Sequence, residues 1–102
     1  MTEAELQAVI IETAQTFGFL VYHTYDSRRS HPGFPDLVLC RPPDVLYLEL
    51  KSDKGRLRPD QDSWIGALRQ SGQNVQVWRP SDWLDGTVMQ ALKPQPTSTR
   101  SR

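Results

Sequence analysis

The chain has 102 residues, equal numbers of acidic and basic side chains, and a single cysteine. This length allows one domain with a modest core. One cysteine excludes an internal disulfide, and Cys40 is expected to be a core thiol in a reducing compartment. No apolar run approaches the roughly 20 residues that span a bilayer, and no signal segment is evident, so we expect a cytoplasmic protein without a membrane partner.

Positive charge is concentrated in the middle of the chain. Residues 1–27 contain no Lys or Arg, whereas residues 28–58 contain Arg28, Arg29, Arg41, Lys51, Lys54, Arg56 and Arg58. Because the net charge is zero, this distribution indicates a local footprint for phosphate and argues against a general nucleic-acid binder.

Apolar side chains recur at helical spacing over residues 3–17, which predicts an amphipathic helix with Thr2 as N-cap. Glu3 and Glu5 lie in its first turn, where the helix dipole favours acidic side chains. In helical projection Glu3 lies nearer than Glu5 to the centre of the apolar stripe, so Glu3 is expected to face inward. Complementation of the dipole alone remains an alternative for both acids.

A strand and a polar loop follow the first helix. Residues 19–25 are rich in β-branched and aromatic side chains, which predicts a strand. The loop over residues 26–33 contains Arg28, Arg29 and His31. Guanidinium groups suit phosphates, so these residues are candidate DNA contacts, with a solvated loop as the alternative.

Two short apolar runs, residues 37–40 and 45–50, flank a turn at Pro42-Pro43-Asp44 and predict paired strands. Glu49 and Lys51 are two residues apart and therefore share one face of the second strand.

Asp36 begins the first of these strands, so pairing brings it near the far end of the second. Two carboxylates, from Asp36 and Glu49, and the ammonium of Lys51 then converge at one edge of the sheet. Clustered carboxylates suit a hard cation such as Mg²⁺, and a lysine beside it could orient water or stabilise a phosphoryl transition state. A solvated ion pair at a strand end is the alternative.

A second basic loop, residues 52–58, leaves this strand and contains Lys54, Arg56 and Arg58, which are also candidate DNA contacts. A helix is predicted from Pro59 to about residue 71. It places Gln61 on an apolar stripe, where the side chain needs a partner near the core. A local hydrogen bond to the backbone is the alternative for this glutamine.

Residues 74–78 alternate as a last strand, and residues 82–92 are predicted to form a closing helix weakened by Gly86. Residues 93–102 have the composition of a disordered tail. The resulting fold class is α/β, a mixed central sheet flanked by helices in the order α-β-β-β-α-β-α, with one domain over residues 1–92.

The segment Gly33-Phe34-Pro35-Asp36-Leu37-Val38-Leu39, followed by Glu49-Leu50-Lys51, resembles the PD-(D/E)xK nuclease signature. With Gln61, Trp64 and Gly72 further along, the chain resembles more narrowly the VRR-NUC group in its stand-alone, phage-type form. The resemblance implies a restriction-endonuclease-like fold and a DNA endonuclease dependent on Mg²⁺ (or Mn²⁺).

The same resemblance implies roles for individual residues. Catalysis is assigned to Asp36, Glu49, Lys51 and Gln61, and metal binding to Asp36 and Glu49 with Glu3 from the first helix. It further implies a homodimer acting on branched DNA, such as Holliday junctions or flaps, in replication, repair or recombination, in a bacterial or phage-infected cytoplasm. A non-catalytic nucleic-acid-binding module, a structural partner of a larger DNA-processing assembly and a hydrolase of a small phosphate ester remain alternatives.

Overall fold

The computed structural model describes residues 1–24 and 31–94. The elements are α1 (Glu3–Thr16), β1 (Leu20–His23), β2 (Leu37–Arg41), β3 (Asp44–Leu50), α2 (Pro59–Gln70), β4 (Asn74–Trp78), α3 (Pro80–Leu84) and α4 (Thr87–Leu92). The predicted α/β class and element order are confirmed. Arg28 and Arg29 lie outside the described residues, as does nearly all of the predicted tail.

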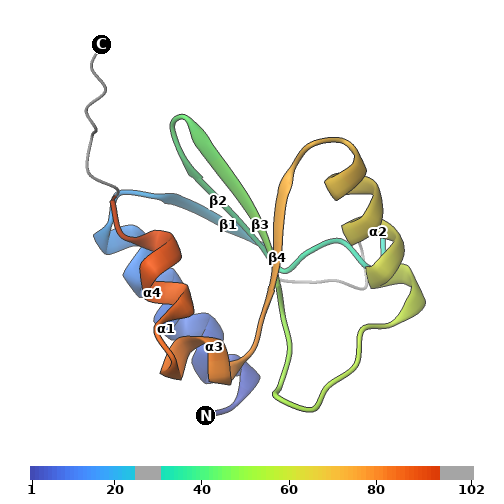
Figure 1. The fold of residues 1–102 in the computed structure, drawn as a ribbon, viewed down its shortest axis with the longest axis horizontal. Coiled ribbons are helices and arrows are strands. Elements are labelled where there is room, and N and C mark those ends of the chain that lie inside the picture. Colours follow the sequence, from blue (N-terminus) through green and yellow to red (C-terminus); the bar gives the residue numbers. More distant parts are fainter. Residues whose placement is uncertain (25–30, 95–102) are drawn as a thin grey trace.

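The strands form one mixed sheet in the order β1-β2-β3-β4. β1 pairs with β2 and β2 with β3 in antiparallel fashion, and the β2–β3 hairpin closes with Arg41 opposite Asp44. β4 returns through α2 to run parallel to β3, as a crossover connection requires. Figure 1 shows α1, α3 and α4 on one side of this sheet and α2 on the other.

The main core lies between the sheet and the helices α1 and α4. Leu46, Leu48 and Leu50 alternate along β3 and all point into it, as the period of a strand dictates. The other buried apolar members are Leu6, Ile10, Ala14, Phe19, Leu37, Leu39, Trp78, Val88 and Leu92. The opposite face of β3 is thereby left to Tyr47 and Glu49, and it is this face that meets α2.

The closing helix differs from the prediction of one segment over residues 82–92. It is divided into α3 and α4 by Asp85 and Gly86, and Gly86 has a φ of 89°. This left-handed conformation cannot continue a right-handed helix, so the chain turns and a second helix begins.

The position of Cys40 differs from the prediction of a core thiol. Its side chain is partly exposed on the sheet face opposite the main core.

The described residues contain no helix both long and apolar enough to cross a bilayer.

A close backbone contact fixes the segment that leads into β2. Gly33 has a φ of 95°, and a Cβ at this position would lie 2.6 Å from the carbonyl carbon of Asp60 and 3.0 Å from the amide nitrogen of Gln61. Glycine is therefore required twice, once for the left-handed backbone and once for the space. The contact locks the Pro35-Asp36 segment against the first turn of α2.

Gly33→Ala should therefore lower the free energy of unfolding by about 2 kcal/mol or more, because it adds a steric clash to the strain of a left-handed residue. Gly72→Ala is the matched control: Gly72 has a φ of 85°, with nothing within 4 Å of its Cβ position. Its cost should be about 1 kcal/mol. Urea unfolding of both variants measures the difference, and equal costs would show that the Gly33 contact is loose.

Candidate active site

Asp36 is fixed at the start of β2 by a backbone contact across the hairpin. Its Oδ2 accepts a hydrogen bond from the Leu50 amide at 2.8 Å. The carboxylate therefore lies beside the last residues of β3, next to Glu49, and the predicted convergence of the two acids is confirmed. A carboxylate that accepts a backbone N–H is held in one orientation, which is what a preorganised site requires.

Glu49 is the buried centre of the site. The residue is 1% exposed, and its Oε2 accepts a hydrogen bond of 2.9 Å from the Gln61 amide Nε2. Its Oε1 is buried without a hydrogen-bond partner among the described residues. Burial, followed by the neighbouring negative charge of Asp36, raises the pKa of Glu49 from 4.5 to about 8, while the positive charge of Lys51 acts in the opposite direction.

Gln61 connects this carboxylate to the loop before α2. While its Nε2 donates to Glu49, its Oε1 accepts the backbone N–H of Arg58 at 2.9 Å. The side chain therefore serves both purposes considered from the sequence, the local backbone contact and a contact in the buried site. A glutamine is suited to this position because its amide both donates and accepts.

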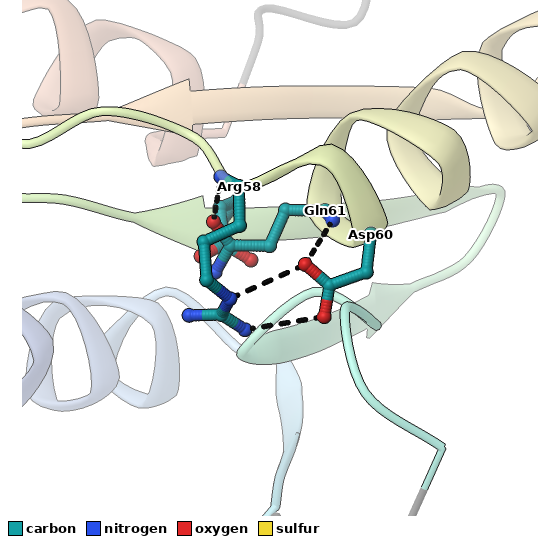
Figure 2. Close-up of polar contacts among 4 residues, drawn as sticks. Arg58, Asp60 and Gln61 are labelled. Carbon is teal, nitrogen blue, oxygen red and sulfur yellow. Dashed lines mark hydrogen bonds and ion pairs between the residues drawn. The ribbon is translucent and has the colours of Figure 1, made fainter.

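Arg58 and Asp60 form an ion pair above the first turn of α2. The Arg58 Nε lies 3.2 Å from Asp60 Oδ1, and Asp60 Oδ1 also accepts the Gln61 backbone N–H at 3.0 Å (Figure 2). The sequence analysis did not identify Asp60, although its spacing from Arg58 at a helix start could have indicated the pair. The pair places the Arg58 guanidinium at the mouth of the site.

These side chains line a pocket of about 400 Å³. It gathers the predicted residues Glu3, His31, Asp36, Glu49, Lys51, Arg58 and Gln61, together with Thr24, Pro32, Gly33 and Phe34. The candidate DNA contacts Lys54 and Arg56 are exposed and do not line it, and Arg28 and Arg29 lie outside the described residues. Phe34 was not predicted as a site residue; it packs edge-to-face on Tyr47 and Trp64.

The two acids at the start of α1 occupy different environments. Glu5 completes a capping box, in which its Oε1 accepts the Thr2 backbone N–H at 2.7 Å and its own N–H donates to Thr2 Oγ1 at 3.0 Å. Glu3 lies exposed at the pocket, and its negative charge adds to the rise in the pKa of Glu49. Of the two acids, only Glu3 therefore faces the site.

The donor set fits a hard divalent cation with few protein ligands. Among the described residues, no three His, Cys, Asp or Glu side chains lie close enough to hold a metal ion between them. Asp36 and Glu49 nevertheless present two adjacent carboxylates, and no residue that the structure describes offers a hydrogen bond to the buried Oε1 of Glu49. Mg²⁺ typically takes one or two carboxylates and completes its shell with water and phosphate oxygens. The pair suits such an ion, with Glu3 farther out.

Several known proteins resemble this chain. The sequence profile of the VRR-NUC domain matches residues 1–82. None of the curated protein sequences matches. A solved VRR_NUC domain protein superposes with a TM-score of 0.67 at 23% identity, covering 88% of this chain and 87% of its own. A second solved VRR_NUC domain gives 0.71 at 25% identity, with coverages of 87% and 97%.

A third solved structure, Hjc of Archaeoglobus fulgidus, a Holliday junction resolvase from an archaeal hyperthermophile, gives a TM-score of 0.48 at 23% identity. That match covers 76% of this chain and 65% of Hjc.

The mixed sheet and flanking helices define an α/β fold, with the carboxylate pair at the end of the central strand β3. Within that class, the chain belongs to the VRR-NUC family of nuclease domains.

The raised pKa of Glu49 predicts how stability changes with pH in the absence of metal. The native state holds a proton on Glu49 more tightly than the unfolded state does. This contribution is fully present below about pH 4.5 and is lost as the pH rises through about 8. Glu49→Gln cannot ionise and should lack this loss.

Urea unfolding in EDTA at about pH 6 and about pH 8.5 measures the effect. The parent should lose more stability between these values than Glu49→Gln does. The same pH dependence in both proteins would mean that Glu49 ionises freely.

Proposed function

We propose that this protein is a metal-dependent DNA endonuclease that hydrolyses phosphodiester bonds. The observation that carries the proposal is the buried Glu49 carboxylate, which lies beside the fixed carboxylate of Asp36 and has one oxygen without a hydrogen-bond partner in the described part of the chain. Such a pair is unfavourable unless it binds a proton or a cation. The intact carboxylates and Lys51 in one pocket weigh against a module that only binds nucleic acid.

Three acidic residues of the pocket hold the metal ion in this proposal. Asp36 and Glu49 hold Mg²⁺ (or Mn²⁺), and Glu3 supports the ion from farther out. When bound, the cation polarises a phosphoryl oxygen and lowers the pKa of a coordinated water.

Two further residues act around this centre in the proposal. Lys51 shares a sheet face with Glu49 and stabilises the charge that develops on the phosphoryl group. Gln61 holds the Glu49 carboxylate in place through its amide, at 2.9 Å.

The basic side chains around the pocket are proposed to bind the DNA backbone. His31 and Arg58 line the pocket, and Lys54 and Arg56 are exposed on the adjoining loop. Arg28 and Arg29 are proposed contacts on sequence grounds. Guanidinium and ammonium groups beside a carboxylate pair suit the binding of DNA, because their positive charge offsets the negative charge of the carboxylates and of the DNA phosphates.

Family resemblance extends the proposal to the substrate. Branched DNA, such as Holliday junctions or flaps, is the proposed target, in replication, repair or recombination. The single cysteine accords with a reducing cytoplasm, bacterial or phage-infected.

Cleavage of labelled linear, flapped and four-way DNA in Mg²⁺ or Mn²⁺ tests the proposed activity. The parent should cut, and Asp36→Asn or Glu49→Gln should abolish cleavage, because each removes a charged oxygen ligand. Glu3→Gln should lower the rate to a smaller extent. Glu5→Gln is the matched control, since a glutamine preserves the capping box, and it should cut at the parent rate.

Full activity of Asp36→Asn or Glu49→Gln would remove that residue from the site. A parent protein that binds all three DNAs and cuts none would favour the non-catalytic alternative.

We also propose that the protein is a homodimer, paired through the sheet face beside α2. Two rows of side chains cross β1, β2 and β3 on this face: Leu20, Cys40 and Val45 in one row, and Tyr22, Val38 and Tyr47 in the other. Leu20 is 75% exposed and Tyr22 is 61% exposed, although both are large and apolar.

The chemistry of this face favours a second copy of the same chain as its binding partner. None of the six side chains carries a carboxylate, ammonium or guanidinium group, so the face offers nothing to DNA phosphates. In a two-fold dimer the same patch meets itself, and an uncharged apolar patch is complementary to its own copy. The face also adjoins the pocket, since Thr24 lines the pocket one residue after β1 ends.

Light scattering after size exclusion should give about twice the protomer mass of 11.7 kDa. Leu20→Glu should convert the dimer to a monomer, because it places a charge in an apolar interface. Leu84→Glu is the matched control, because Leu84 is equally exposed at 75% but lies on α3, away from this face. A monomeric parent, or a dimer that survives Leu20→Glu, would contradict the proposed interface.

A further inference from the structure

The loop that follows Lys51 is held by an arginine at the end of the neighbouring strand. The β3–β4 ladder extends one residue past β3, where the Lys51 amide donates to the Trp78 carbonyl at 3.1 Å. Arg79 comes immediately after Trp78 and therefore begins beside the point where the chain leaves Lys51. None of the functional roles above uses this arginine.

The Arg79 guanidinium contacts three backbone carbonyl groups of residues 52–55. Its Nη1 donates to the carbonyl oxygens of Ser52 and Gly55, both at 2.7 Å, and lies 3.4 Å from that of Asp53. Hydrogen bonds from a charged donor are shorter and stronger than neutral ones, as these short distances indicate. The Ser52 carbonyl also accepts the Gly55 backbone N–H at 3.2 Å, so Arg79 binds a loop that is already closed by one turn.

Two further hydrogen bonds fix the clasp at both ends. The backbone N–H of Ser81, in the first turn of α3, donates to Asp53 Oδ1 at 3.0 Å. The backbone N–H of Arg79 itself donates to Asp82 Oδ2 at 2.8 Å. The Arg79 side chain therefore ties the loop to the end of β4, and the Asp53 side chain ties it to α3.

The clasped loop runs beside the side chain of Lys51. A Cβ added at Gly55 would lie 2.8 Å from Ser52 Oγ and 3.6 Å from Lys51 Cδ. Gly55 therefore adjoins the lysine side chain, and its carbonyl is one of the two held by Arg79 at 2.7 Å. The segment that Arg79 holds is thus the one that lies next to Lys51.

We propose that Arg79 is a positioning residue that orients Lys51 for phosphodiester hydrolysis by clasping the loop from Ser52 to Gly55. This inference rests on the proposed function of Lys51. A lysine side chain has several rotatable bonds. A loop that is fixed beside it reduces the number of conformations in which the ammonium lies away from the reacting phosphate. Asp53 is the second tie of the same loop.

The single-turnover cleavage rate at saturating protein tests the proposal without a contribution from DNA affinity. Arg79→Ala should lower this rate between about 10-fold and 100-fold, as expected when a reacting group is displaced by about 1 Å. Arg79→Lys, whose ammonium can donate to several carbonyls, should recover much of the loss. Arg69→Ala is the matched control, because Arg69 donates to the Val75 carbonyl at 2.9 Å, far along the chain from the loop, and its rate should match the parent.

A double-mutant cycle with Lys51→Ala separates positioning from a general loss of structure. If Arg79 acts through Lys51, adding Arg79→Ala to Lys51→Ala should change the residual rate by less than about twofold. A full further loss in that background would overturn the proposal. So would equal losses in Arg79→Ala and Arg69→Ala.

Trypsin digestion gives a readout that does not depend on activity. Arg79→Ala should accelerate cleavage after Lys54 and Arg56, whereas Arg69→Ala should not. Asp53→Ala, at an exposed position that the fold tolerates, should accelerate it to a smaller extent, and Asp53→Asn should not. Unchanged cleavage in Arg79→Ala would overturn the clasp. If the parent itself cut no DNA, the proposed function would fail while this measurement still decided whether Arg79 holds the loop.

Discussion

The rest of the site depends on the neutralisation of two carboxylates at the end of the central strand β3. Glu49 is buried, Asp36 lies beside it, and burial together with this neighbour raises the pKa of Glu49 to about 8. Without metal, the protein resolves the conflict by keeping a proton near pH 7. A divalent cation can replace that proton and supply the chemistry of phosphodiester hydrolysis. In our proposal, the feature that is unfavourable without an ion is the one that creates affinity for it.

Hydrogen bonds from other segments of the chain hold the two carboxylates in place. Asp36 is oriented by the Leu50 amide, and Glu49 by the side chain of Gln61, whose other end is fixed on the Arg58 amide. The absence of a side chain at Gly33 lets the Pro-Asp segment approach α2 closely enough for these contacts. In our proposal the Arg79 clasp plays the same part for Lys51. Asp36, Glu49 and Lys51 would then each be held by a neighbouring group.

Much of this arrangement could be predicted from the sequence. Strand periodicity placed Glu49 and Lys51 on one face, and the hairpin turn placed Asp36 opposite them, because both patterns are local and nearly free of ambiguity. Helical projection favoured Glu3, and the capping box that engages Glu5 agrees with it. The contacts of Arg79 could not be predicted, because they depend on carbonyl positions that no side-chain pattern encodes. Gly86 indicates a weak point in the predicted closing helix, but the sequence does not specify its left-handed φ of 89°, so it predicts one segment where the structure has two.

Proton release on metal binding tests the central claim most directly. Titration calorimetry with Mg²⁺ or Mn²⁺ at pH 7, in two buffers of different ionisation enthalpy, counts the protons displaced per ion. Because Glu49 has a pKa of about 8, the account predicts the release of close to one proton by the parent and of none by Glu49→Gln, together with weaker binding. Metal binding without proton release, or no binding at all, would contradict the claim that this carboxylate pair exists to hold a cation.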